Sequence, residues 1–170
     1  MCAACSNSKP PRIEHTFGEL IISEVGFEPN LKDQVVSLDD CVKSISSRRP
    51  DLVWIIPGRV AIVVEIDENS HVGYSPENEV SKIIEQSDCI RHLHECENSI
   101  VFTIRVNPDT YDGARTTIKE RAKVVGKIIK QIIKGKISSR DADNILFAYY
   151  HSKSCNLMRE QAKHFNIMEI

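Results

Sequence analysis

The sequence of 170 residues has no long uninterrupted apolar run and no basic-then-apolar leader at its start. A transmembrane helix needs about 20 consecutive apolar residues, so we expect neither a membrane span nor secretion. The formal net charge is only -2, so any binding to a polyanion must come from a local patch. With 41% hydrophobic and 27% charged residues, the composition is that of an ordinary globular domain.

Cysteine pairs at metal-binding spacing are scarce, because only Cys2 and Cys5 among the six cysteines form a C-x-x-C motif. Without a leader, we expect reduced thiols and an intracellular protein, in the cytoplasm or nucleus. Two thiolates at this spacing suit one zinc ion, but a structural site takes four ligands. Residues 1–12 are therefore half of a zinc site completed upstream in a longer protein, or a tail with two free thiols. The composition favours the tail, and the folded domain is expected over residues 13–170.

Apolar patterning predicts alternating helices and strands. Helical spacing of apolar residues predicts helices over 13–25, 77–94, 114–135 and 156–165. Continuous apolar runs rich in β-branched residues predict strands over 52–56, 60–66, 99–106 and 144–150. Gly26 is expected to cap the first helix, and Pro57-Gly58 to form the turn between the first two strands. This order predicts an α/β sandwich in which helices flank a central mixed sheet.

Acidic side chains gather where two predicted strands meet. Asp51 precedes the first strand, and Glu65 ends the next one fourteen positions later. If these strands form an antiparallel hairpin, both carboxylates lie at one end of the sheet and repel each other unless a cation lies between them. Oxygen ligands favour hard divalent cations, so we predict that Asp51 and Glu65 hold Mg²⁺ or Mn²⁺. Such an ion can bind a phosphate oxygen and activate water for in-line attack.

Further polar residues surround this pair in the sequence. Asp67 shares the face of Glu65 along an extended chain, and is predicted to be a third metal ligand or to orient water. His71 is a candidate general base, and Glu19 on the first helix is a candidate acid supporting metal or water. For each residue alone, a solvated strand end or loop is the commoner explanation. The joint pattern carries the prediction of a site.

Candidate phosphate-binding cations lie outside the acid cluster. Arg105 and Asn107 share one face of the third long strand, and Arg105 either clamps a phosphate with its guanidinium or pairs with an acid of the protein. Nine Lys or Arg residues lie between positions 115 and 140, a basic patch that the net charge hides. A solvated helix face is the commoner origin of such a run, and DNA-backbone binding is the functional one. The candidate nucleic-acid-binding residues are Arg49, Arg105, Asn107, Lys119 and Lys123.

The string Arg49-Pro50-Asp51, two strands, and then Glu65-Ile66-Asp67-Glu68-Asn69-Ser70-His71 resembles the PD-(D/E)xK nuclease superfamily. It looks most like the branch related to very-short-patch-repair endonucleases. It is also similar to proteins of giant and algal viruses that carry an Ile-Arg-x-Asn-Pro-Asp motif, here residues 104–109. The resemblance covers residues 14–109. It implies a restriction-endonuclease-like αβββαβ core with C-terminal strand and helix additions, and metal-dependent cleavage of DNA, with Asp51 and Glu65 as metal ligands.

One departure from the superfamily pattern concerns Asp67, which stands where the superfamily has a lysine. That lysine positions or activates the attacking water and stabilises charge. An aspartate cannot stabilise a developing negative charge but can bind metal or orient water, so the resemblance leaves the positive or polar function to His71 or Lys82. The branch named above shares the departure. Three functions follow: a Mg²⁺- or Mn²⁺-dependent endodeoxyribonuclease, which we favour, an inactive nuclease fold that binds DNA or protein, or a structural component of a viral particle. A homodimer is compatible with each.

Overall fold

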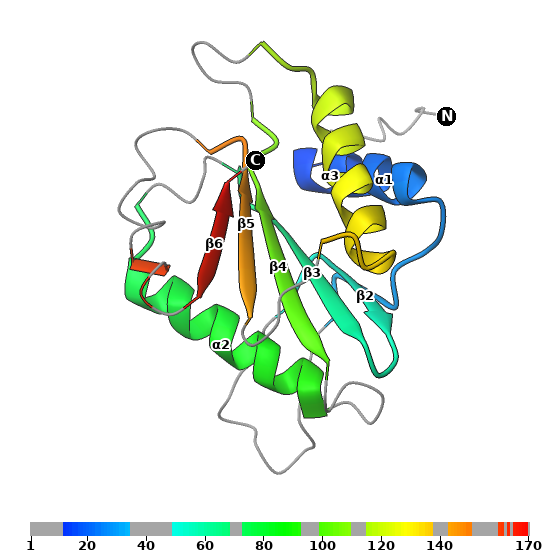
Figure 1. Cartoon of the computed structure of the whole chain (residues 1–170). Helices are drawn as coiled ribbons and strands as arrows, with labels where there is room; N and C mark the ends of the chain where they lie inside the picture. Colours follow the sequence, from blue (N-terminus) through cyan, green and yellow to red (C-terminus); the bar gives the residue numbers. More distant parts are fainter. Residues whose placement is uncertain are drawn as a thin grey trace, which may run out of the picture.

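The structure is a computed structural model that describes residues 12–34, 49–68, 73–92, 99–109, 115–137, 143–150, 160–161, 163 and 165–169. The fold is α/β, with a mixed sheet flanked by helices, as predicted (Figure 1). Along the chain the elements are α1 (Ile13–Val25), β1 (Leu31–Lys32), β2 (Leu52–Ile56), β3 (Val60–Ile66), α2 (Pro76–His92), β4 (Ile100–Val106), α3 (Ile118–Ile133), β5 (Asn144–Ala148) and β6 (Asn166–Glu169).

The six strands follow one another across the sheet in sequence order. β1, β2 and β3 are antiparallel, whereas β3 to β6 run parallel. The predicted turn joins β2 and β3, and Gly58 adopts a φ of 67° there, which a glycine reaches without steric cost. Leu52 pairs with Val64, so Asp51 and Glu65 occupy the next positions of the two strands at one end of the sheet. The predicted hairpin is therefore confirmed.

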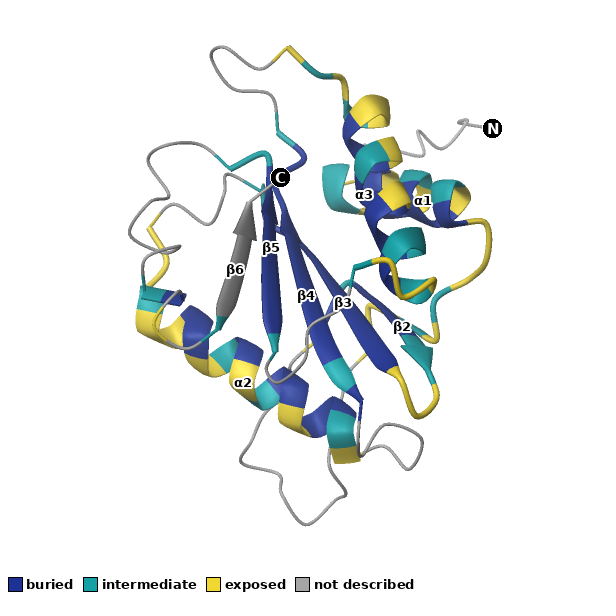
Figure 2. Cartoon of the chain, in the orientation of Figure 1, coloured by how far each residue is buried: buried dark blue, intermediate teal, exposed yellow. Residues whose placement is uncertain are grey.

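The two faces of the sheet are covered by different helices. Even-numbered residues of β2 to β5 pack in the core beneath α1 and α3, whereas their odd-numbered residues pack toward α2. Because side chains alternate along a strand and both faces are covered, every residue of β3 is buried (Figure 2). The helices are buried only on the sides that meet the sheet or each other.

The pair formed by α1 and α3 is held by a close approach of the two helices. A Cβ atom placed on Gly126 of α3 would lie 2.6 Å from Cβ of Glu24 on α1, so only glycine fits at this crossing. Lys130 of α3 donates to the backbone oxygen of Glu24 at 2.6 Å and satisfies a carbonyl near the end of α1. Gly26 ends α1 in the left-handed conformation, as predicted. Thr117 and Glu120 form a capping box at the start of α3.

The C-terminal part of the chain differs from the prediction. The helix expected over 156–165 is wrong at its end, because Lys163 lies in a turn and Phe165 in a bend, and the described helical residues there are Glu160 and Gln161. The strand β6, which begins at Asn166, was not predicted. The run Asn166-Ile167-Met168-Glu169 is too short for a periodicity signal, and it forms a strand because β5 offers an open edge for pairing. Within the described parts of the chain, no helix combines the length and apolarity that crossing a bilayer requires.

Candidate functional site

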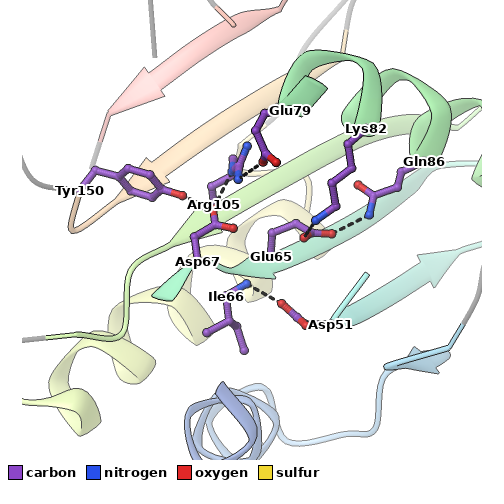
Figure 3. Close-up of polar contacts among 9 residues, drawn as sticks. All are labelled: Asp51, Glu65, Ile66, Asp67, Glu79, Lys82, Gln86, Arg105 and Tyr150. Atoms are coloured by element: carbon purple, nitrogen blue, oxygen red, sulfur yellow. Dashed lines mark hydrogen bonds and ion pairs between the residues drawn. The ribbon is translucent and has the colours of Figure 1, made fainter. Parts of the chain in front are cut away.

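The polar side chains of interest gather at the carboxyl ends of β3 and β4, on the face toward α2 (Figure 3). Glu65 pairs with Arg105 in the parallel register of β3 and β4, and Asp67 follows β3 directly. All three are odd-numbered, so the alternation of the strands turns them toward α2. Burial leaves Glu65 only 4% exposed and leaves Asp67 and Arg105 1% exposed. Charged groups this deeply buried need partners.

Arg105 lies between two carboxylates. Its Nε donates to Asp67 Oδ2 at 2.6 Å, and its Nη2 donates to Glu79 Oε2 of α2 at 2.6 Å. Burial by itself would lower the pKa of Arg105, but the negative charge of Asp67 and, more weakly, of Glu79 raises it well above its ordinary value. The guanidinium therefore stays charged and bridges β4, the end of β3 and α2.

Tyr150, which follows β5, completes this network. Its hydroxyl donates to Asp67 Oδ2, and its ring meets Phe147 edge-on with the centroids 4.9 Å apart. Burial and the charge of Asp67 raise the pKa of Tyr150 well above its ordinary value of 10, so the hydroxyl keeps its proton. Asp67 is thus held by a cation from one strand and a hydroxyl donor from beyond the next (Figure 3).

Arg105 and Asn107, which were predicted to contact phosphate, are buried in the structure. Arg105 does not reach the surface, and the alternative that it pairs with an acid of the protein describes its geometry. Asn107 is 2% exposed, and its Oδ1 accepts a hydrogen bond from the backbone nitrogen of Asp109 at 2.9 Å. Arg105 is turned inward because α2 covers this face of the sheet, which the sequence pattern left open.

Glu65 has its own partners on α2. Lys82 Nζ donates to Glu65 Oε2, and Gln86 Nε2 donates to Glu65 Oε1 at 2.7 Å. Burial by itself would lower the pKa of Lys82, but the adjacent Glu65 carboxylate raises it above its ordinary value, so the ammonium stays charged. The Lys82 side chain is 19% exposed, so it touches both Glu65 and solvent.

Asp51 meets this cluster from β2. Its Oδ2 accepts a hydrogen bond from the backbone nitrogen of Ile66 at 2.6 Å, which fixes the carboxyl at the end of β3. Burial and the charge of Glu65 raise the pKa of Asp51 from 3.8 to about 7, and the Ile66 nitrogen and Lys82 offset only part of that rise. The predicted meeting of two carboxylates at one end of the sheet therefore has an energetic consequence: near neutral pH the pair carries less than two negative charges.

The charge balance of the whole cluster favours a cation. Four carboxylates, those of Asp51, Glu65, Asp67 and Glu79, face two cations, so the ionised cluster has a formal charge of -2. Asp51 and Glu65 are hard oxygen donors on neighbouring strands and fit Mg²⁺ or Mn²⁺, which bind through one or two protein carboxylates and retain water. Within the described ranges, no three His, Cys, Asp or Glu side chains are arranged to hold one metal ion. Asp67 is held by Arg105 and Tyr150 instead of joining the other two acids.

A small cavity of about 30 Å³ lies beside Asp51 on the side of α1. Its walls include His15 and Gly18 of α1 and Lys32 of β1, together with Asp51 itself. A space of this size has room for about one water molecule. Asp51 therefore borders both the acid cluster and a small cavity whose lining includes other charged side chains.

From α1 to β4 the described elements follow the order α-β-β-β-α-β. Comparison with known proteins finds no matching family model, no matching curated protein and no matching solved structure. The resemblance to the nuclease superfamily rests on the motif residues alone.

The other predicted residues lie away from the acid pair or outside the described residues. Glu19 is on the exposed surface of α1, where it pairs with Lys32, and it does not line the cavity beside Asp51. Arg49 is exposed and pairs with Asp33 at 2.7 Å. Lys119 and Lys123 are exposed on α3, which covers the opposite face of the sheet from Glu65. Three predicted residues fall outside the described part of the chain, namely Cys2, Cys5 and His71.

Several residues of the cluster were not predicted from the sequence. Glu79, Lys82 and Gln86 stand three and four positions apart, which places them on one face of a helix. Glu79 and Gln86 are buried polar residues on the same helix as the buried Ile83 and Ile90. Polar residues at helical spacing among apolar core positions are the sequence signal that could have identified these three residues. Of the three, only Lys82 was predicted. Tyr150 gave no signal beyond its position directly after a strand.

Proposed function

We propose that this chain is a Mg²⁺- or Mn²⁺-dependent nuclease that hydrolyses phosphodiester bonds in DNA, on a restriction-endonuclease-like fold. The observation that carries the proposal is the Asp51 carboxyl, held beside Glu65 with its pKa raised to about 7. Carboxyl groups with strongly raised pKa values gather at functional sites, where a bound ligand compensates them. A divalent cation is the simplest compensation for two adjacent carboxylates.

In this proposal Asp51 and Glu65 hold the cation. The ion, when bound, would polarise a phosphate oxygen and lower the pKa of a coordinated water. The hydrogen bond from Gln86 orients the Glu65 carboxylate, and the one from the Ile66 nitrogen orients Asp51. The protein thus fixes both carboxylates before any ligand arrives, which lowers the cost of reorganisation.

In this proposal Lys82 takes the place of the superfamily's motif lysine, whose position in this chain is held by Asp67. Its ammonium lies against Glu65 and is partly exposed, so it can turn toward a substrate phosphate without leaving the site. There it would donate to a phosphate oxygen and stabilise negative charge as it develops. Asp67 serves a different purpose, since it fixes Arg105 and thereby the position of α2 over the strand ends.

The exposed lysines of α3 support binding to the DNA backbone. Of the basic residues in this region, Arg121 is buried against backbone oxygens, and Lys130 contacts α1. The remaining described ones are exposed, and Lys119, Lys123 and Lys127 follow one another at four-residue spacing along one side of the helix. Such a row neutralises phosphates and makes the affinity depend on salt. The exposed basic residues are Arg115, Lys119, Lys123, Lys127, Lys134 and Lys136.

A nicking assay on supercoiled plasmid with Mn²⁺ or Mg²⁺ tests the nuclease. Wild-type protein should nick the plasmid only with the metal, and Asp51→Asn and Glu65→Gln should abolish nicking. Lys82→Ala should reduce the rate about 100-fold, the usual effect of losing one charge-stabilising donor, and Lys82→Arg should restore part of it. Asp88→Asn makes the same charge change at an exposed position of α2 and should leave nicking intact. Nicking that survives in Asp51→Asn, or its absence in the wild type, contradicts the proposal.

A catalytically silent module that binds DNA is the second candidate. It is favoured by Asp67, which replaces the motif lysine and whose Oδ2 accepts hydrogen bonds from Arg105 and Tyr150. This alternative expects normal folding, no cleavage with any divalent ion, and DNA binding that weakens with salt. Electrophoretic mobility shifts of the Glu65→Gln variant separate the two candidates. If the protein is a silent module, this variant should bind DNA as tightly as the wild type does, with or without Mn²⁺.

A further inference from the structure

A second cavity lies at the other end of the sheet, between the first residues of β3 and β4 and the end of α3. Its volume is about 200 Å³. Val60 lines it and Glu65 lies five residues further along β3, so at 3.3 Å per residue the cavity is roughly 16 Å from the acid cluster along the strand. It also lies on the face of the sheet that α3 covers. The cavity is therefore separate from the site described above.

The lining of this cavity is apolar except for one cation. Besides Gly135 and the Arg59 side chain, every lining residue is a hydrophobic one from β3, from β4, from the end of α3 or, for Ile137, from the segment that follows α3. Arg59 Nη2 donates to the backbone oxygen of Ile133 at 2.7 Å, which uses one of the five N–H groups of the guanidinium. The cation and the hydrophobic residues of the lining are Arg59, Val60, Ile100, Phe102, Ile132 and Ile137.

Three exposed cations lie on the lining of the cavity or next to it in the chain. Arg59 is exposed, and so are Lys134 and Lys136, which flank Gly135 in the chain. Among the described residues, no acidic side chain lines the cavity. The carbonyl groups at the end of α3 are already satisfied, since Lys134, Gly135 and Lys136 donate to them through their backbone nitrogens. A negatively charged group at the mouth would thus meet cations and few unsatisfied carbonyls.

We propose that this cavity binds a small amphiphilic carboxylate, with its apolar body among the hydrophobic residues and its carboxylate on Arg59. An apolar cavity of about 150 Å³ is enough to hold benzene, so the volume here suits one ring or an alkyl chain of about six to eight carbons. It is too small for a helix or strand of a partner protein. Arg59 supplies the planar donor pair that a carboxylate matches. This site is independent of the proposed nuclease function.

The test is a titration of the ¹⁵N-labelled protein with phenylacetate, followed by amide chemical shifts. We expect saturable shifts at Gly135 and Ile137, which line the cavity. Phenylacetamide has the same shape without the charge, and it should bind about tenfold or more weakly, because a hydrogen bond to a charged group is the stronger one. The amides of Glu65 and Asp67 should not move, since they lie at the far end of β3.

Two variants separate the charge from the space. Arg59→Gln should remove the preference for phenylacetate over phenylacetamide, and Ile137→Phe should block both by filling the cavity. Arg49→Gln removes an exposed arginine at the other end of the sheet and should change nothing. Circular dichroism verifies that each variant is folded. The proposal is overturned if no saturable shift occurs at Gly135 and Ile137 up to about 10 mM phenylacetate, if phenylacetamide binds equally well, or if folded Ile137→Phe binds as the wild type does.

Discussion

Replacing Asp51 by asparagine should stabilise the metal-free protein at about pH 8 and change its stability little near pH 4. The folded protein raises the pKa of Asp51 from 3.8 to about 7, through burial and the charge of Glu65. Between these two pH values the folded protein retains a proton that the unfolded chain has released. The free energy of unfolding therefore falls as the pH rises through this window, and the loss is complete above about pH 7.

The size of this effect follows from the pKa difference. A difference of about 3 units corresponds to about 4 kcal/mol at 1.36 kcal/mol per unit, and the value for a partly exposed carboxyl is smaller. An asparagine still accepts the hydrogen bond from the Ile66 nitrogen but gives up the attraction to Lys82. We expect Asp51→Asn to gain about 2–3 kcal/mol at pH 8 relative to pH 4.

Urea unfolding followed by tryptophan fluorescence measures this difference, because Trp54 is the sole tryptophan of the chain and is fully buried. Ionisable groups that do not interact with Asp51 contribute equally to wild type and variant, so the difference between them reports Asp51 together with its coupling to Glu65 and Lys82. Asp88→Asn, on the exposed side of α2, serves as the control and should show no such pH dependence. The reasoning is refuted if Asp51→Asn destabilises the protein at pH 8, or if its effect is the same at both pH values.

Four other variants test the fold and the DNA-binding surface. Gly126→Ala should destabilise the protein by about 1–3 kcal/mol, because its Cβ would clash with α1, whereas Gly18→Ala has van der Waals room and should be neutral or stabilise by up to about 1 kcal/mol. Arg105→Leu should cost about 3–5 kcal/mol, since it leaves two buried carboxylates without their cation. Replacing both Lys119 and Lys123 by glutamate should weaken DNA binding. It should also reduce the slope of log affinity against log salt concentration by the amount expected for about two lost phosphate contacts.

The measurements for these substitutions are direct. Urea denaturation compares the two glycine variants, and equal stability of both would contradict the tight helix crossing. The same method applied to Arg105→Leu should show a cost that shrinks at low pH, where the carboxylates are protonated. Fluorescence anisotropy with labelled DNA over a range of salt concentrations tests the lysines. Lys163 is an exposed lysine outside α3, and Lys163→Glu makes the same charge change as each single substitution. If Lys163→Glu lost half as much binding free energy as the double variant loses, a specific role for α3 would be contradicted.

The fold was predictable where the sequence pattern is long and regular. The apolar run of β3 and the turn at Pro57-Gly58 predicted the hairpin, and the hairpin register places Asp51 beside Glu65. Helix α3 shows strong helical periodicity of apolar residues, so its existence and its buried side followed from spacing. β6 could not be predicted, because four residues carry too little pattern and its pairing depends on the open edge of β5.

The site was predictable only in part, because its chemistry depends on what covers the sheet. Alternation along β3 and β4 predicts that Asp67 and Arg105 lie on one face of the sheet. It does not indicate whether that face meets solvent or a helix. Since α2 crosses above them, Arg105 is committed to Asp67 and Glu79 instead of phosphate. The partners of Glu65 come from α2, whose packing against the strands is a tertiary contact that no local pattern encodes.

Isothermal titration calorimetry with Mn²⁺ tests the central claim that Asp51 and Glu65 together hold a divalent cation. Because the pKa of Asp51 is raised to about 7, we expect Mn²⁺ to bind saturably and to displace close to one proton at about pH 6 and almost none at about pH 8.5. Buffers with different ionisation enthalpies report the proton count. Binding should disappear in Asp51→Asn and Glu65→Gln and persist in Asp88→Asn. Saturable binding that survives in Asp51→Asn, or no binding to the wild type, would contradict the account.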